Sequence, residues 1–223
     1  GEEPFVPKRS ESYIGVMIDD LVTKGVDEPY RLLSSRAEYR LMLRHDNAHL
    51  RLSKYGYRIG LIPHWFYDKV VSLENAITHQ LERLEQVKIP ASDQVNDILT
   101  SLGTSPISEG TRLAKLIRRP EIKYKDLKIL DPEPIEDHEV VEQLEVQLKY
   151  EGYIKNMLDQ IKVFEEYESL PLVNIKFTQV PNLSTEAREK LEKIKPFSIG
   201  QAMRISGVTP ADILALLTFL NKK

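Results

Sequence analysis

Residues 65–87 read WFYDKVVSLENAITHQLERLEQV, and this stretch predicts the fold class of the chain. Its apolar side chains recur at steps of four and three, at Phe66, Val70, Leu73, Ile77, Leu81 and Leu84. This spacing places them on one face of a helix of about six turns. A helix with an apolar face of that length needs a second surface to cover it, so we expect a mainly α fold.

A second long helical stripe supplies that surface. From Glu136 onward the apolar residues again follow the helical period, with a change of phase near Gly152. Residues 171–181, bounded by prolines, predict a linker or an edge strand. Shorter helices are expected at 92–102, at 110–118, from Ser184 to about Lys193, from Ser198 to Ser206, and from Pro210 to about Leu220.

The last helices carry clear end signals. Ser198 and Gln201 fit a capping box, and Gly207 suits the left-handed residue that ends a helix. Thr209 and Pro210 suit the start of the next helix. We therefore expect three parts along the chain: a connecting segment at 1–60, a helical domain with the two long helices at 61–173, and a small helical subdomain at 174–223.

Composition excludes several classes of function. The chain has 223 residues, of which 41% are hydrophobic and 29% charged, and a net charge of −3, which is typical of a folded globular protein. It contains no Cys, which excludes disulfides, thiolate metal sites and thiol nucleophiles. Its ten glycines form neither GxGxxG nor a phosphate loop. No apolar run approaches a transmembrane length and the first residues do not resemble a secretory signal, so we expect a cytoplasmic protein.

Basic side chains gather between residues 31 and 58. This basic cluster holds Arg31, Arg36, Arg40, Arg44, Arg51, Lys54 and Arg58, against only Glu38 and Asp46. The even spacing of Arg36, Arg40 and Arg44 puts these three on one side of either a helix or a strand. A capping-box pattern at 35–38 favours a helix, whereas the alternation over 37–45 favours a strand, and both remain open.

Two interpretations of the basic cluster follow. Several guanidinium groups in register suit the phosphates of a sugar–phosphate backbone, and Tyr30, Tyr39, Tyr55 and Tyr57 offer stacking faces for bases. This interpretation predicts a site for RNA or another polyanion. The alternative is a solvated surface whose arginines pair with acidic groups elsewhere in the chain.

Three other patterns support weaker hypotheses. His45 and His49 stand four residues apart, but no further ligand is near them, so we expect no metal site. Asp19 and Asp20 with Glu28 are acid–base candidates, although adjacent carboxylates point apart and are more typical of helix starts. The last predicted helix is too apolar to read DNA, so we expect it to pack in a core or against a protein partner.

Three motifs, in the same order, resemble the MnmG/GidA family, also called the glucose-inhibited division protein A family. Residues 28–52, EPYRLLSSRAEYRLMLRHDNAHLRL, resemble the family signature. YIGVMIDDLV at 13–22 resembles the segment upstream of it, and GQAMRISGVTPA at 200–211 resembles the C-terminal motif. Residues 65–180 resemble the family mainly in their helical pattern.

The resemblance implies a place in a larger enzyme. With the GTPase MnmE, the family adds a carboxymethylaminomethyl or aminomethyl group to C5 of the tRNA wobble uridine, using FAD, NADH and a folate one-carbon donor. Its flavin-binding domain lies N-terminal to these motifs, so the resemblance implies a C-terminal region preceded by the last segment of that domain. The parent is expected to be a homodimer. We expect no catalytic residue, bound cofactor or metal in this chain, and no membrane or DNA contact.

The resemblance also implies roles for individual residues. Arg31, Arg36, Arg40 and Arg44 resemble tRNA-contacting residues of the family, and Arg51 and Arg58 extend the basic cluster. The motif associated with the partner GTPase and with tRNA is matched by Gln201, Arg204, Ile205, Gly207 and Val208. We therefore expect the tRNA- and partner-binding region of a flavin-dependent tRNA modification enzyme. The alternative is a docking and dimerisation module without its own RNA site.

Overall fold

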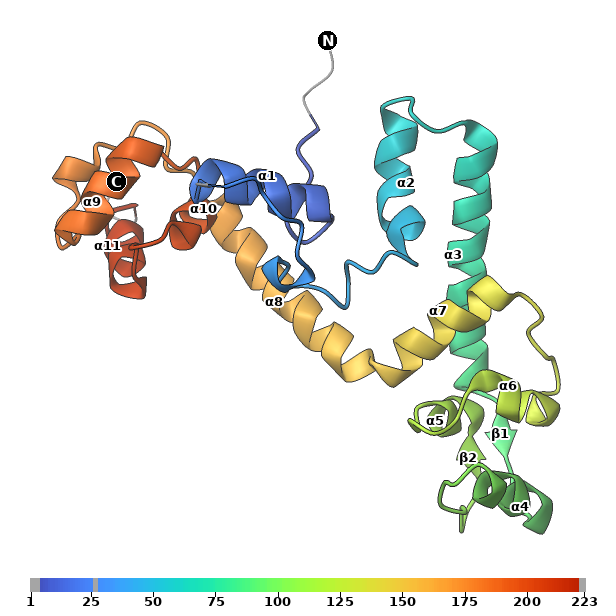
Figure 1. Ribbon diagram of the computed structural model, residues 1–223. Coiled ribbons are helices and arrows are strands. Elements are labelled where there is room, and N and C mark those ends of the chain that lie inside the picture. Colours follow the sequence, from blue (N-terminus) through green and yellow to red (C-terminus); the bar gives the residue numbers. More distant parts are fainter. Residues whose placement is uncertain (1–4, 26–27, 221–223) are drawn as a thin grey trace. The chain divides into compact units, whose positions relative to one another are not determined.

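The computed structural model describes residues 5–25 and 28–220 (Figure 1). The chain forms two compact units, one made of residues 1–44 with 156–223 and the other of residues 45–155. They are called here the split unit and the central unit. The split unit exists because helices near both ends of the sequence pack on each other. The boundaries of these two units differ from those of the three parts expected from the sequence. The three expected parts therefore stay a prediction.

The central unit is helical with one minimal sheet. Its strands are two residues long and pair antiparallel, with Lys88 opposite Arg112 and Ile89 opposite Thr111. Its elements are α2 (Ala48–Arg58), α3 (His64–Leu84), β1 (Lys88–Ile89), α4 (Asp93–Ser101), β2 (Thr111–Arg112), α5 (Leu113–Ile117), α6 (Tyr124–Leu127), a 3-10 helix (Lys128–Leu130), α7 (His138–Lys149) and the first residues of α8 (Glu151–Ser169). The helices expected over 65–87 and 92–102 are thus confirmed as α3 and α4. The helix expected over 110–118 is shorter than predicted, because Thr111 and Arg112 pair with β1 as strand β2 and only Leu113–Ile117 form α5.

The predicted apolar face of α3 forms part of the core of the central unit. Val70, Leu73, Ile77 and Leu84 are buried, and Leu81 packs at the edge of the same core. The covering surface includes α7, whose residues Val140, Leu144 and Leu148 are also buried. The predicted change of phase near Gly152 corresponds to the end of α7 and the start of α8. The mainly α fold is confirmed.

The split unit holds α1 (Tyr13–Thr23), a 3-10 helix (Ser34–Arg36), most of α8, a 3-10 helix (Phe177–Gln179), α9 (Thr185–Ile194), α10 (Ile199–Arg204) and α11 (Pro210–Leu220). Helix α1 lies in what the sequence indicated as a connecting segment. The Ser12 hydroxyl caps it by accepting a hydrogen bond from the backbone N–H of Gly15, at 3.0 Å. Gly15 also lets the chain pass close by, since a Cβ there would lie 2.3 Å from the Lys8 carbonyl oxygen.

The end signals of the last helices are confirmed in part. The Ser198 hydroxyl accepts from the Gln201 backbone N–H at 3.2 Å, but the Gln201 side chain accepts from the N–H of Phe197 instead of that of Ser198, so the capping box is incomplete. Gly207 has the expected left-handed φ of +91°, but it lies in the turn after α10, which ends at Arg204. Thr209 and Asp212 form a reciprocal cap: the Thr209 hydroxyl accepts from the Asp212 N–H at 3.3 Å, and the Asp212 carboxylate accepts from the Thr209 N–H at 2.9 Å. Pro210 is the first residue of α11, as predicted.

Residues 171–181 form neither a regular linker nor a strand of a sheet. Pro171 makes a single antiparallel bridge with Ser198, and the stretch ends in the 3-10 helix Phe177–Gln179. Leu172, Phe177 and Val180 are buried in the core of the terminal helices. Among the helices of the described ranges, none combines the length and apolarity needed to cross a membrane.

Candidate nucleic-acid interface and C-terminal motif

The arginine-rich segment over 36–45 is neither the helix nor the strand that the sequence left open. After the 3-10 helix Ser34–Arg36 the chain runs through turns until α2 begins at Ala48. Regular spacing therefore does not align Arg36, Arg40 and Arg44 in one row. Buried and exposed side chains still alternate over a few residues of this segment, since Ala37 and Tyr39 are buried and Arg40 is exposed.

Buried side chains anchor this segment to α1. Ala37 and Leu43 pack with Val16 in a small core, and the Tyr39 ring meets Phe164 of α8 edge-on, with 6.5 Å between centroids. The segment is therefore fixed in place although its backbone is irregular.

Arg36 is held against α1 by an aromatic ring and a carboxylate. Its guanidinium carbon lies 4.5 Å from the centroid of the Tyr30 ring, and its Nη1 lies 3.8 Å from Oδ2 of Asp20. The Tyr30 hydroxyl donates to the same carboxylate at 2.8 Å. Arg36 remains 36% exposed, so it can be reached from solvent while its orientation is set by α1.

Arg9 fixes the backbone of the arginine-rich segment, a role that no sequence pattern indicated. Its side chain is only 3% exposed and donates to Asp20 at 2.8 Å, to Glu38 at 2.7 Å and to the carbonyl of Arg36 at 3.3 Å. Burial alone would lower the pKa of Arg9, but its hydrogen bonds to Glu38 and Asp20 outweigh burial and raise that pKa. Arg9 is therefore a permanent cation that holds residues 36–38 on α1.

Asp20 gathers several cationic and polar groups. Burial alone would raise its pKa, but hydrogen bonds from Lys24, Arg9 and Tyr30 outweigh burial and hold the pKa of Asp20 below its usual range. A carboxylate that stays ionised and fully paired is a poor general base. The geometry thus gives Asp20 a structural role.

Arg204 of the C-terminal motif lies inside the split unit. Its side chain is 11% exposed and binds Asp19 of α1 through two hydrogen bonds, Nε to Oδ2 at 2.5 Å and Nη2 to Oδ1 at 2.6 Å. It also pairs with Glu168 of α8, and its guanidinium carbon lies 5.0 Å from the centroid of the Phe164 ring. Arg204 therefore joins three helices, α1, α8 and α10.

Asp19 links Arg204 to Arg9. The Arg9 guanidinium donates to the Asp19 carboxylate at 3.1 Å, on the same oxygen that accepts from Arg204 Nε. A continuous series of ion pairs thus runs from Arg204 through Asp19 and Arg9 to Glu38. The C-terminal motif and the arginine-rich segment are distant in sequence but share one ionic network.

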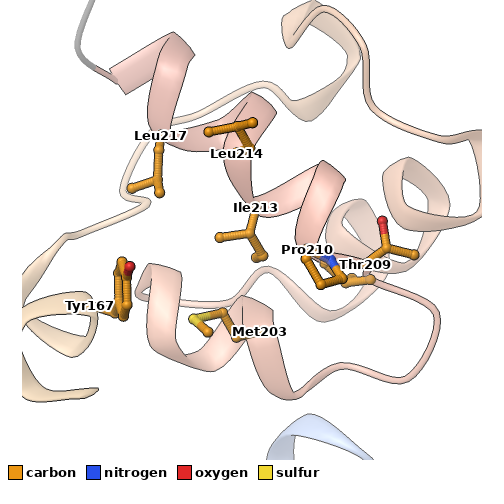
Figure 2. A pocket seen from close by; sticks show the side chains of 8 residues that line it. Tyr167, Met203, Thr209, Pro210, Ile213, Leu214 and Leu217 are labelled. Atoms are coloured by element: carbon orange, nitrogen blue, oxygen red, sulfur yellow. The ribbon is translucent and has the colours of Figure 1, made fainter. Parts of the chain in front are cut away.

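The other residues of the C-terminal motif lie in different environments. Ile205 is 3% exposed and belongs to the core, and Gly207 has a left-handed φ of +91° in the turn between α10 and α11. The Gln201 side chain is half-buried and accepts from the backbone N–H of Phe197 at 2.7 Å. Val208 lines a groove of about 410 Å³ together with Tyr167, Met203, Thr209, Pro210, Ile213, Leu214 and Leu217. Figure 2 shows Met203 of α10 and Ile213 of α11 facing each other across this groove.

The remaining arginines of the basic cluster differ in position and burial. Arg31 and Arg40 are exposed on the split unit, whereas Arg44 is half-buried and donates to the Leu41 carbonyl at 2.8 Å. Arg51 and Arg58 belong to the central unit. Arg51 donates to Asn47 at 2.8 Å, and the exposed Arg58 lies 5.6 Å from the centroid of the Tyr55 ring. The six arginines are thus divided between two units.

The weaker sequence candidates gain no catalytic or metal-binding geometry. Within the part of the chain that the structure describes, no three His, Asp or Glu residues gather as a metal site would require. His49 instead lies 3.0 Å from a carboxylate oxygen of Glu139 on α7. Glu28 is exposed, whereas the carboxylates of Asp19 and Asp20 are paired with arginines.

Comparison with known proteins identifies similar chains along the whole length. Residues 65–158 match the family model of the tRNA modifying enzyme MnmG/GidA C-terminal helical domain, and residues 160–223 match that of the MnmG/GidA C-terminal helical bundle.

Full-length relatives extend this similarity. The tRNA uridine 5-carboxymethylaminomethyl modification enzyme MnmG of Caldicellulosiruptor saccharolyticus is 50% identical, with 100% of this chain and 36% of the relative covered. MnmG of Clostridium kluyveri is 48% identical with the same coverage. The structure of Aquifex aeolicus GidA in its form II crystal aligns with a TM-score of 0.82 and 40% identity, over 99% of this chain and 34% of that one. The chain therefore spans about a third of the length of these relatives.

Proposed function

The chain belongs to the MnmG/GidA family, and we propose that it is the tRNA- and partner-binding region of a tRNA-modifying enzyme. In this proposal the parent enzyme works with the GTPase MnmE. Together they add a carboxymethylaminomethyl or aminomethyl group to C5 of the tRNA wobble uridine. The parent is a cytoplasmic homodimer that uses FAD and NADH at sites outside these residues.

The observation that supports tRNA binding most strongly is the fixed presentation of exposed arginines. Arg31 and Arg40 are exposed, and the backbone next to Arg40 is anchored by the buried Tyr39 and by Arg9. Arg36 is oriented by the Tyr30 ring. Side chains presented from an anchored backbone lose less conformational freedom on binding, so phosphate contacts retain more of their interaction energy. Guanidinium groups are also the side chains best shaped for phosphate oxygens.

Partner docking is proposed for the apolar groove of the terminal helices. Leu214 is 65% exposed and Met203 is 42% exposed, and both line the groove beside Val208 of the C-terminal motif. Exposed apolar side chains around a hollow are typical of protein-binding surfaces. Gln201, Arg204, Ile205 and Gly207 do not line the groove; in this proposal they hold α10 and the turn after it in place through caps, ion pairs and core packing.

Flavin binding does not fit the residues of this chain. A dinucleotide site needs a glycine-rich turn between a buried strand and a helix. In the described ranges, the two strands have two residues each and pair antiparallel, and no GxGxxG occurs in the sequence. The proposal therefore assigns these residues to binding of tRNA and the partner, with no step of the flavin chemistry.

Direct tRNA binding by variants of the chain tests the proposal. The double variant Arg31→Ala/Arg40→Ala removes two exposed cations of the basic cluster. Arg112→Ala/Lys115→Ala is the matched control, because it removes two exposed cations from the central unit. We expect at least about tenfold weaker tRNA binding in the first variant and little change in the control, since hydrogen bonds to charged groups contribute about 1.5–3 kcal/mol each.

Equal affinity in both double variants and the wild type would contradict the tRNA assignment. That result would favour the alternative, a docking and dimerisation module without its own RNA site. Docking is tested separately by Leu214→Glu, which is expected to weaken binding of the GTPase but not of tRNA. Ile129→Glu, at a site 78% exposed in the central unit, is the control.

A further inference from the structure

The loop between α2 and α3 carries a surface that the basic cluster only partly includes. Helices α2 and α3 lie side by side and are joined by residues 59–63 (Figure 1). The last turn of α2 and the first turn of α3 therefore meet at one end of this helix pair. We call residues 54–69 the α2–α3 tip.

Aromatic rings dominate the α2–α3 tip. The rings of Tyr57 and Tyr67 stack with 4.6 Å between centroids and an angle of 2°, and His64 stacks on Tyr57 at 5.6 Å. The Tyr57–Tyr67 pair links the two helices. Trp65 is different: it is 68% exposed, and its ring lies nearly perpendicular to the Phe66 ring, at 85° with 5.7 Å between centroids.

Packing within the unit explains the tyrosine pair but not the position of Trp65. A tryptophan buries more apolar surface than almost any other side chain when it enters a core. Here it stands at the second position of α3 and is exposed, whereas Val70 and Leu73 further along that helix are buried. A large, mostly exposed ring of this kind is available to a ligand.

The α2–α3 tip is basic. Lys54, Arg58 and Lys69 are exposed, and Asp68 is the one acidic residue in the sequence between Arg51 and Glu74. That carboxylate lies 3.3 Å from Nε2 of His64. Lys54 Nζ and the Arg58 guanidinium carbon lie 4.8 Å and 5.6 Å from the centroid of the Tyr55 ring. Lys54 and Arg58 are thus held along α2, in the same α2–α3 tip as the exposed ring of Trp65.

Exposed rings beside cations suit one kind of ligand best. Unpaired nucleotides stack their bases on aromatic side chains while Lys and Arg contact the adjacent phosphates. Paired nucleotides cannot do this, because their bases are already stacked within a duplex. A protein partner fits less well, since charged residues are depleted at the centre of protein–protein interfaces.

We propose that the α2–α3 tip binds an unpaired nucleotide of RNA, whose base stacks on Trp65 and whose neighbouring phosphates lie against Lys54 and Arg58. The inference rests on the proposed function in that the RNA is tRNA. It adds a stacking contact to the arginine contacts and names unpaired nucleotides as what the tip recognises.

Trp65 reports on its own contact. It is the single tryptophan of the chain, so tryptophan fluorescence comes from this side chain alone. Titration of the 223-residue chain with tRNA is expected to quench this fluorescence, and the quenching should saturate together with binding measured by filter retention. A blunt RNA duplex of equal length is expected to leave the fluorescence nearly unchanged.

Substitution tests the energetic role of the ring. Trp65→Ala is expected to weaken tRNA binding by about 5- to 150-fold, the range of one base–aromatic stack, and Trp65→Phe is expected to restore part of it. The matched control is Tyr153→Ala on α8, because Tyr153 is 69% exposed. It is expected to bind tRNA like the wild type.

The possible outcomes separate this inference from the proposed function. If tRNA binds without quenching and Trp65→Ala binds like the wild type, the tip contacts no RNA, while tRNA binding by the basic cluster stands. Quenching that follows the concentration of the chain itself, without RNA, would identify a contact between copies and overturn the inference. Absence of any tRNA binding overturns both.

Discussion

Replacing Arg204 with alanine is expected to destabilise the split unit by about 3 to 5 kcal/mol, the usual loss when one partner of a buried ion pair is removed. The structure places the loss mainly at Asp19, which is 12% exposed and would keep only the Arg9 contact at 3.1 Å. Glu168 is 29% exposed and can regain part of its hydration. The contact with the Phe164 ring is lost as well.

Arg118→Ala provides the control for this prediction. Arg118 also pairs with two carboxylates, Glu85 and Glu151, but these partners are 33% and 63% exposed. Solvent screens such pairs, so we expect a loss of no more than about 1 kcal/mol. The comparison isolates the effect of burying the pair.

Urea denaturation followed by circular dichroism measures both losses, and hydrogen–deuterium exchange localises them. In Arg204→Ala, amides of α1 and α10 are expected to exchange about 100-fold faster or more, since 1.4 kcal/mol corresponds to a factor of ten. Amides of α3 should change far less. A loss in Arg204→Ala no larger than that in Arg118→Ala would refute the structural role of Arg204.

Three further substitutions, of Asp212, Gly207 and Gly152, test single positions in α8 and the terminal helices. Burial alone would raise the pKa of Asp212, but hydrogen bonds from Thr209 and Ser184 lower it from 3.8 to about 2. The carboxylate therefore stabilises the fold above pH 4 by about 2 kcal/mol, and this stabilisation is lost as the pH falls toward 2. Asp212→Asn is expected to show no such loss of stability between about pH 4 and pH 2 when acid denaturation is measured. Gly207→Ala is expected to destabilise by about 1–2 kcal/mol, because φ is +91°. Gly152→Ala, in open space on α8, is expected to stabilise by up to about 1 kcal/mol, and thermal denaturation distinguishes the two signs.

Patterns that repeat along the chain were predictable from the sequence. The apolar spacing of α3 and the caps around Ser198 and Thr209 depend on residues a few positions apart, and the structure confirms them. Helix α1 was not predicted, because Gly15 is a residue more typical of loops. The reason for a glycine within this helix is the close approach of the Lys8 carbonyl, which the sequence does not show.

Contacts between distant residues were not predictable. The Arg204–Asp19 pair joins residues 185 positions apart. The C-terminal motif alone indicated a binding role for Arg204, whereas the structure shows its guanidinium within an ionic network. Arg9 carried no signal for the same reason. The exposure of Trp65 likewise depends on how α2 and α3 pack.

The decisive measurement is the salt dependence of tRNA binding. The slope of log affinity against log salt concentration counts phosphate contacts, at about one unit for each. We predict a slope shallower by about two for Arg31→Ala/Arg40→Ala and an unchanged slope for Arg112→Ala/Lys115→Ala. The prediction would be contradicted if the slope is unchanged in the first variant and binding weakens only when the residues after Pro196 are removed. In that case the arginine-rich segment is not the tRNA site.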